Sequence, residues 1–481
     1  MTDVRKIAHN TLIQVIGKAL SIAIGLIGFG LMARYLGQEG FGYYSTIYAF
    51  LAIFGILIDL GLQMTTTQLI SDPAEDESRI LSNSLTIRLT ASIIFLGVAP
   101  LIALFFPYPK IIKIGIAVAA VGFIFTSLVS TLTSLFQKHL VMYKVATADV
   151  VAKILFIVVL ISAVSLDLGL MGIISAVVID SFFTFAILFY FASQKVLIRP
   201  AFDLLVWRKI ISRTWPIALT IGLNLIYFKG DIFIMSLIKS QTEVGLYGAP
   251  YKVLEVLINI NYLFLGLILP ILTMVIAVKN LERLKIVIQS TFNFLIILTT
   301  PLIVGGYFLG RPLMVLMAGP DFVISGDIIK ILLIATGAIL TAGLFGYVIV
   351  ALNKQKQMIK FYAANAIISI IGYLIFIPLY SYWGAAWMTV FTEVFILFTA
   401  AYVMKKNINF LPGLKIFWKS IAAALVMAIP LYLFPNLSFI ISLTIGVVVY
   451  FIALYLLKGF DKETVLDIIK IKNHETPDNQ L

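Results

Sequence analysis

Hydrophobic residues of this chain gather in long uninterrupted stretches that are separated by short polar links. Fourteen stretches are long enough, or nearly so, to cross a bilayer as helices. None of the links is long enough to form a soluble domain. The pattern predicts an all-α polytopic membrane protein, with spans at approximately Leu12–Ala33, Tyr44–Thr67, Leu81–Phe105, Ile114–Phe136, Val145–Val164, Leu170–Ala192, Trp215–Ile238, Pro250–Val278, Val287–Leu309, Ile328–Leu352, Phe361–Leu379, Trp383–Met404, Phe417–Phe434 and Phe439–Leu457.

Composition agrees with a membrane solvent. Hydrophobic residues make up 61% of the chain, charged residues 12%, and the mean hydropathy is +1.06, whereas soluble domains carry about 25% charged residues. The absence of cysteine excludes disulfides, thiolate metal sites and a cysteine nucleophile. Met1–Asn10 is too brief for the n-region and cleavage site of a signal peptide, so we expect the first helix to be retained.

Lysine and arginine positions indicate the orientation. If the N-terminus is cytoplasmic, the cytoplasmic links and tails hold 24 of the 35 basic residues, and the external links hold five. This bias predicts that both termini are cytoplasmic and that Lys458–Leu481 is a solvated tail. The net charge of +12 is therefore mostly a topology signal. Because it is spread over many loops without a binding motif, we expect no nucleic-acid partner.

A short repeat suggests two similar halves. Gln38, Gly42, Tyr44 and Tyr48 align with Gln241, Gly245, Tyr247 and Tyr251, and a weaker match aligns Lys138, Met142, Lys144 and Asp149 with Lys354, Met358, Lys360 and Asn365. Six predicted helices separate equivalent positions, which favours parallel repeats. We expect a six-helix lobe over residues 1–193, a basic cytoplasmic linker over 194–214, a second lobe over 215–404, a helix pair over 405–457 and a tail over 458–481.

Charged residues within the predicted spans are the candidates for chemistry. Each costs at least about 2.5–3.5 kcal/mol at mid-membrane, so each should face protein or water. They lie on polar stripes with helical spacing, and two such stripes in each lobe predict a cationic central cavity. The stripes include Gln14 and Lys18; Tyr48 and Asp59; Asn224, Tyr227 and Asp231; and Lys252, Glu255, Asn259 and Tyr262.

Each charge also has a purely structural interpretation. Lys252 and Glu255 are three residues apart and can neutralise each other, and Lys229 can snorkel from a helix end. Arg88, Lys153 and Lys330 lie near helix ends, where snorkelling or pairing within a lobe is expected. Lys18 has no carboxylate within one turn, which makes it the sharpest cavity candidate. The candidates for ion or proton coupling, or for gating, are Asp59, Asp231, Glu255 and Glu393.

Several motifs carry a family resemblance. They are Asn10-Thr11-Leu12, Ala33-Arg34-Tyr35-Leu36-Gly37 with Gly40-Phe41-Gly42, and Asp231 followed by Gly245-Leu246-Tyr247. Together with the topology, they resemble the polysaccharide flippases of the multidrug/oligosaccharidyl-lipid/polysaccharide exporter superfamily. The resemblance implies a V-shaped, alternating-access transporter that moves undecaprenyl-diphosphate-linked oligosaccharide to the external leaflet of the plasma (inner) membrane, as O-antigen flippases do.

The implied substrate fits the candidate residues. Ammonium and guanidinium groups form charge-assisted hydrogen bonds with a diphosphate, which assigns Lys18, Arg34, Lys229 and Lys252 to the anionic head. Gln14, Asn224, Tyr227 and Asn259 suit a sugar. The resemblance implies no cofactor beyond coupling H⁺ or Na⁺, a monomer in contact with membrane lipids, and a polysaccharide polymerase and glycosyltransferases as partners.

The sequence leaves three other functions open: a drug or cation antiporter, a lipid-II flippase, and a membrane-bound glycan polymerase or ligase. A drug or cation antiporter of the same superfamily needs intramembrane carboxylates to bind cations, and here few stand apart from lysines. A lipid-II flippase also has basic residues on its first and eighth helices, which Lys18 and Lys252 parallel by helix alone. A glycan polymerase or ligase would need large external loops with catalytic groups, and the three histidines, His9, His139 and His474, have no evident catalytic partners.

Overall fold

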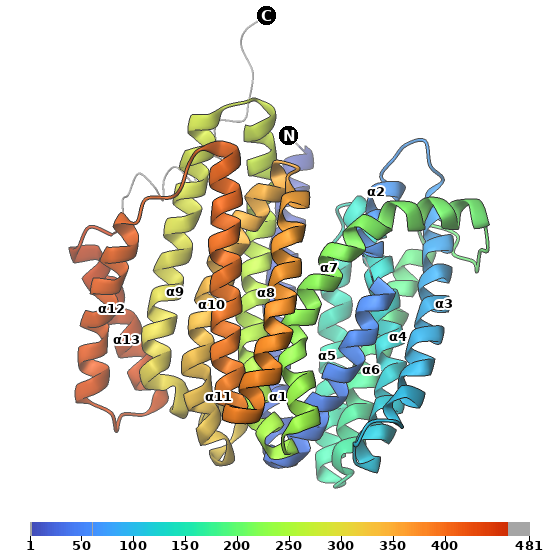
Figure 1. The fold of residues 1–481 in the computed structure, drawn as a ribbon. Helices are drawn as coiled ribbons and strands as arrows, with labels where there is room; N and C mark the ends of the chain where they lie inside the picture. The colour runs from blue at the N-terminus through green and yellow to red at the C-terminus, as the bar shows by residue number, and fades with distance from the viewer. Residues whose placement is uncertain (1, 60, 460–481) are drawn as a thin grey trace, which may run out of the picture. The chain divides into compact units, whose positions relative to one another are not determined.

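The computed structural model describes residues 2–59 and 61–459, and the side chains of these residues except 2–12, 15, 56 and 215–228. This part of the chain is helical apart from its links and two short 3₁₀ turns, Pro320–Phe322 and Gln355–Met358. The helices are α1 Thr2–Asp59, α2 Leu62–Ile70, α3 Glu77–Ala103, α4 Lys110–Lys138, α5 Tyr143–Ser165, α6 Gly169–Ser193, α7 Leu204–Ile238, α8 Gln241–Ala277, α9 Leu281–Ala318, α10 Val323–Ala351, α11 Ile359–Ile408, α12 Lys415–Leu433 and α13 Phe439–Leu456 (Figure 1).

The predicted all-helical class is confirmed. Eleven helical segments of the described residues are long and apolar enough to cross a bilayer. Helix α11 runs through two predicted spans with a break at Ser381 (φ 51°, ψ −134°). Helix α1 breaks at Gly37 (φ 63°, ψ −173°) and covers the first predicted span and most of the second, whose last residues lie in α2. The seventh helix begins at Leu204 rather than at the predicted Trp215. The total of fourteen spans stays a prediction.

The described chain divides into two compact units, and each is described on its own. Unit 1 comprises residues 1–249, 317–321 and 370–382, and unit 2 comprises residues 250–316, 322–369 and 383–481. The predicted division into two six-helix lobes and a C-terminal pair stays a prediction beside this division by contact.

Each unit has its own apolar core. In unit 1, α3, α4, α5 and α6 pack side by side (Figure 1), and their core includes Leu132, Phe136 and Leu188. In unit 2, α8, α9, α10 and α11 bury a second cluster, while α12 and α13 pack against each other around Tyr450. Large apolar side chains also cover the outward faces of the helices, as expected where lipid replaces water: Leu101, Ile161, Phe398, Leu425, Ile440 and Ile452.

The first half of the predicted basic linker is bound to α3, whereas its second half, from Leu204, is the start of α7. Side chains of α3 supply donors and acceptors to the backbone of residues 197–203, which is how a non-helical segment satisfies its polar groups. The bonds are Ser82 Oγ to the oxygen of Leu197 (3.4 Å), the nitrogen of Arg199 to Ser82 Oγ (3.2 Å), the nitrogen of Ala201 to Thr86 Oγ1 (3.0 Å) and the nitrogen of Asp203 to Asn83 Oδ1 (3.0 Å).

Asp203 completes this attachment at the start of α7. Its side chain accepts from the backbone nitrogens of Leu205 and Val206 and pairs with Arg79 of α3. The Arg79 guanidinium, followed by the α7 backbone donors, lowers the pKa of the Asp203 carboxyl. A lowered pKa stabilises the folded state above the unfolded value of about 3.9, and this stabilisation is lost as the pH falls through the folded value.

We therefore expect Asp203→Asn at pH 7 to reproduce the acid state and release the linker. Loss of the Arg79 pair should raise the rate of chymotrypsin cleavage after the exposed Phe202 several-fold. Glu282→Gln is the matched control, because Glu282 pairs only within its own first helical turn with Lys285. Equal cleavage of D203N and wild type would show that the carboxylate does not hold the linker.

Candidate functional site

The two copies of the repeat, Gln38–Tyr48 in α1 and Gln241–Tyr251 in α8, meet at a close crossing. A Cβ placed on Gly42 would lie 1.8 Å from the backbone oxygen of Gln241, and one on Gly245 would lie 1.9 Å from that of Gln38. Thr46 Oγ1 also donates to Gln241 Oε1 at 2.7 Å. The absence of a side chain at each glycine thus allows the backbone of the other copy to approach closely, as small residues do at membrane helix crossings.

Each copy, or the residue just before it, also bonds to a later turn of the same predicted lobe. Tyr35, in the turn before the first copy, donates to Asp167 Oδ1 (2.6 Å) and accepts from the Gly169 nitrogen (2.8 Å), between α5 and α6. At the second copy, the Ser381 hydroxyl at the break in α11 donates to Glu243 (2.5 Å). The two halves therefore use equivalent turns, which agrees with parallel repeats.

Asp231 is a predicted coupling residue that contacts the second repeat copy. Its side chain is fully buried, and the hydroxyl of Tyr247 donates to its Oδ2 at 2.8 Å. Tyr247 belongs to the second repeat copy, so the carboxylate is linked directly to the crossing. Its coupling or gating role stays a prediction.

Lys18 has a carboxylate partner that its own helix does not reveal. Lys18 Nζ of α1 lies 3.4 Å from Asp149 Oδ2 of α5, and Lys153 of α5 lies 2.5 Å from Asp180 Oδ2 of α6. The expectation of pairing within a lobe thus holds for Lys153. The same pairs explain how α5 can be a membrane helix although two charges lie near its start, since each charge meets an opposite charge on a neighbouring helix.

Asp59 has an arginine partner. The side chain of Arg88 is fully buried on α3; it pairs with Asp59 and donates to the Ser127 oxygen (2.9 Å) and Thr131 Oγ1 (3.1 Å). The structural interpretation of Arg88 therefore holds. Asp59 is the last residue of α1, and a cation near the C-terminus of a helix is stabilised by the helix dipole and the unpaired carbonyl groups there.

The candidates in unit 2 are arranged differently. Lys252 Nζ lies 3.0 Å from Glu255 Oε2, as the neutralising interpretation expects. Glu393 is buried in α11, with 4% of its surface exposed, and Asn259 is exposed on α8. Their predicted substrate and coupling roles stay predictions.

The remaining candidates lie in unit 1. Arg34 is exposed, and its Cγ lies 3.2 Å from the position of a Cβ on Gly319. Gln14 and Lys229 are half-buried in α1 and α7. Asn224 and Tyr227 lie in the part of α7 whose side chains fall outside the described residues.

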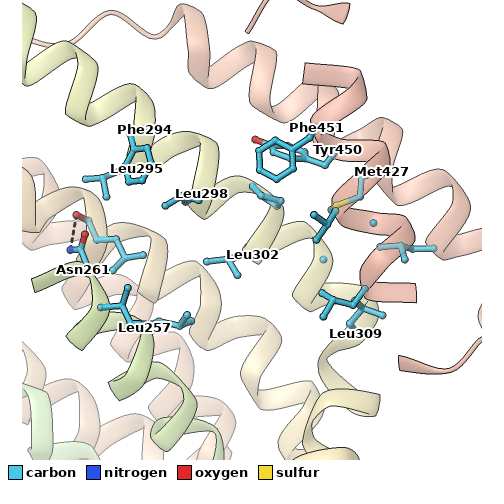
Figure 2. A pocket seen from close by; sticks show the side chains of 18 of the residues that line it. Leu257, Asn261, Phe294, Leu295, Leu298, Leu302, Leu309, Met427, Tyr450 and Phe451 are labelled. Atoms are coloured by element: carbon cyan, nitrogen blue, oxygen red, sulfur yellow. Dashed lines mark hydrogen bonds between the residues drawn. The ribbon is translucent and has the colours of Figure 1, made fainter. Parts of the chain in front are cut away.

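An apolar cavity in unit 2 was not predicted from the sequence. It measures about 480 Å³ and is lined from α8, α9, α10, α12 and α13. Figure 2 shows Leu298 between Phe294 and Phe451 and Leu302 below them in the view. Asn261 lies at one side and donates to the Leu340 oxygen at 3.3 Å. The lining is almost wholly hydrocarbon, so the cavity suits an alkyl or isoprenoid chain rather than a sugar.

One feature of the sequence could have indicated the ion pairs of unit 1. Asp149 and Lys153 interrupt an otherwise apolar span, so each needs an opposite charge, although spacing alone allows them to pair with each other as well as with neighbouring helices. The cavity had no comparable signal, because its leucines and phenylalanines resemble those of any lipid-facing surface.

Comparison with known families bears on this arrangement. Residues 31–325 match the profile of a family described as "Polysaccharide biosynthesis protein". The chain belongs to this family. No curated protein sequence matches it.

Solved structures agree on the fold. The chain is similar to the lipid II flippase MurJ in an inward closed conformation, with a TM-score of 0.75, 16% identity, and coverage of 92% of this chain and 98% of that one. An inward-facing multidrug resistance MATE family transporter of the MOP superfamily gives a TM-score of 0.68, 12% identity, and coverage of 83% and 98%. A MOP superfamily transporter from Pyrococcus furiosus gives a TM-score of 0.60 and 12% identity, with coverage of 84% of this chain and 95% of that one. The protein is thus a multi-pass membrane protein with a MurJ- and MATE-like fold.

Proposed function

We propose that the protein is a flippase that moves polyprenyl-diphosphate-linked oligosaccharide from the cytoplasmic to the external leaflet for surface polysaccharide export. The observation that carries the proposal is the apolar cavity of about 480 Å³ in unit 2. Its volume falls within the usual range of ligand pockets, about 300–1,000 Å³. A transporter of lipid-linked sugar needs such a surface for the hydrocarbon chain, in addition to polar groups for the head.

The head group has its own candidates. Lys18, Arg34 and Lys229 in unit 1, and Lys252 in unit 2, supply cations for a diphosphate. Membership of a polysaccharide biosynthesis family supports a glycan over a drug as cargo. We further propose that the protein lies in the plasma membrane with both termini cytoplasmic, acts as a monomer with alternating access and ion coupling, and works beside a polymerase and glycosyltransferases.

The test is transport in vesicles of defined composition. The purified protein is reconstituted with a fluorescent polyprenyl-diphosphate oligosaccharide, and the fraction accessible to an impermeant glycosidase is followed with time. Leu302→Trp should fill the cavity and slow transport by about tenfold, which corresponds to about 1.4 kcal/mol. Leu302→Met, which conserves volume, should transport as wild type does.

Other cargoes give different outcomes. No transport of the glycolipid by folded wild type, together with export of a cationic dye, would favour a drug antiporter. Transport of lipid II alone would favour a lipid-II flippase. Equal rates for L302W and wild type would remove the cavity from the transport path.

A further inference from the structure

Four charges of unit 1 form a mixed cluster on three adjacent helices. Lys18 of α1 pairs with Asp149 of α5, and Lys153, one turn further along α5, pairs with Asp180 of α6. With all four groups ionised, the cluster has no net charge. Their side chains are 40%, 24%, 30% and 14% exposed for Lys18, Asp149, Lys153 and Asp180 respectively. Because charge facing lipid is costly, these exposed surfaces should face water or substrate.

The Asp180 carboxylate is incompletely satisfied. Its Oδ2 receives the Lys153 ammonium at 2.5 Å, but its Oδ1 is buried without a hydrogen-bond partner among the described residues. A buried, half-satisfied carboxylate depends on its single cation, because loss of that cation would leave an uncompensated buried charge.

Among the residues whose side chains are described, no second cation pairs with Asp180. The charged and titratable groups around it are Lys153 and Asp149 of α5, Lys18 of α1 through Asp149, and Tyr48 of α1, whose ring contacts that of Tyr44. From α4, which also packs against α6, the nearby polar contact is the Thr126 hydroxyl on Ser181 (3.2 Å). The two lysines therefore balance both carboxylates.

We propose that diphosphate and protons bind to this cluster in a linked manner. This proposal rests on the proposed function. Oxygens of the diphosphate take the ammonium groups of Lys18 and Lys153 from Asp149 and Asp180, and each released carboxylate takes one proton from water. In each exchange, the ammonium group leaves the carboxylate and pairs with a phosphate oxygen. The carboxylate takes a proton and becomes a neutral carboxylic acid. No covalent bond to carbon or phosphorus changes.

The exchange has a physical basis on both sides. A diphosphate carries more negative charge than a carboxylate and forms stronger charge-assisted bonds with ammonium groups. A carboxylate left in the membrane without a cation favours its neutral form. Substrate affinity then depends on proton availability, and, because linkage is reciprocal, bound substrate draws protons into the cluster.

The experiment measures proton uptake on binding. Farnesyl diphosphate is titrated calorimetrically into the purified full-length protein at pH 8, in two buffers with different heats of ionisation. We expect wild type to take up one to two protons for each ligand bound. The D149N/D180N variant should take up none and should bind about tenfold more tightly, since its lysines are no longer occupied. K153M should bind more weakly than wild type.

A second measurement needs no variant. As the pH rises through the range where uptake occurs, the affinity of wild type for farnesyl diphosphate should fall. The expected decrease is about tenfold per pH unit for each proton taken up. Binding without proton uptake, or equal uptake by wild type and D149N/D180N, would overturn the linkage while leaving the proposed function intact. A folded wild type that binds no isoprenoid diphosphate would overturn both proposals.

Discussion

Gly42→Ala should open the crossing between the two repeat copies and expose Thr46. The new Cβ would lie 1.8 Å from the backbone oxygen of Gln241, so the helices must separate by more than an ångström. Such overpacking costs about 1–3 kcal/mol, which corresponds to an increase of about 5- to 150-fold in the population of the separated state. Gly245→Ala should act similarly, because its Cβ would meet the Gln38 oxygen at 1.9 Å.

Maleimide labelling measures this opening directly. The chain has no cysteine, so Thr46→Cys introduces a single reactive thiol at a side chain that is fully buried in this structure. Labelling of T46C should be slow, and labelling of G42A/T46C should be faster by the factor given above. Gly97→Ala is the control, because a Cβ there meets nothing within 4 Å. If G42A is folded and does not change the labelling rate, the glycine contact does not hold the crossing closed.

Further contacts flank this crossing on both sides. Gln38 donates to the Asp321 oxygen, in the turn between α9 and α10. On the other side, Ser236, before the second copy, forms a hydrogen bond with Tyr108 in the turn between α3 and α4 (2.8 Å). Each copy therefore reaches an equivalent turn of the opposite half.

The sequence predicted the helical class and the repeat because both depend on local pattern. Long apolar stretches must form helices in lipid, since no water is available to satisfy the backbone. Gly42 and Gly245 were found by alignment alone, but their reciprocal contact is a tertiary property. The pattern also could not decide that Gly37 and Ser381 break helices that otherwise continue, because either position could equally have been a link.

Ion-pair partners were the least predictable part of the site. Lys252 and Glu255 lie on one helical face, so their pair follows from spacing alone. Lys18 and Asp149 are 131 residues apart, and helical spacing says nothing about which helix packs against which. Lys18 was identified as isolated because only its own helix was considered, and Asp59 was separated from Arg88 for the same reason.

The Asp59–Arg88 pair predicts a large loss of stability on changing one partner. Asp59→Asn would leave the guanidinium of Arg88 charged while its side chain is fully buried. Removing one partner of a buried ion pair costs about 3–5 kcal/mol. The Nε of Arg88 already lacks a hydrogen-bond partner among the described residues, and its acceptors Ser127 and Thr131 carry no negative charge, so they do not replace the lost carboxylate. The melting temperature of the detergent-solubilised variant should fall by several degrees.

Replacing the other partner, Arg88, should reduce the stability less. This difference between the two substitutions tests whether Asp59 and Arg88 form a structural ion pair. Arg88→Met removes the buried charge and leaves Asp59, whose side chain is 43% exposed and can be hydrated. The double variant D59N/R88M should then be more stable than D59N alone, because no uncompensated charge remains buried. A coupling role for Asp59 makes the opposite prediction: D59N would melt as wild type does and lose only ion-driven transport. Comparing the melting temperatures and vesicle transport of these three variants therefore separates a structural ion pair from a coupling carboxylate.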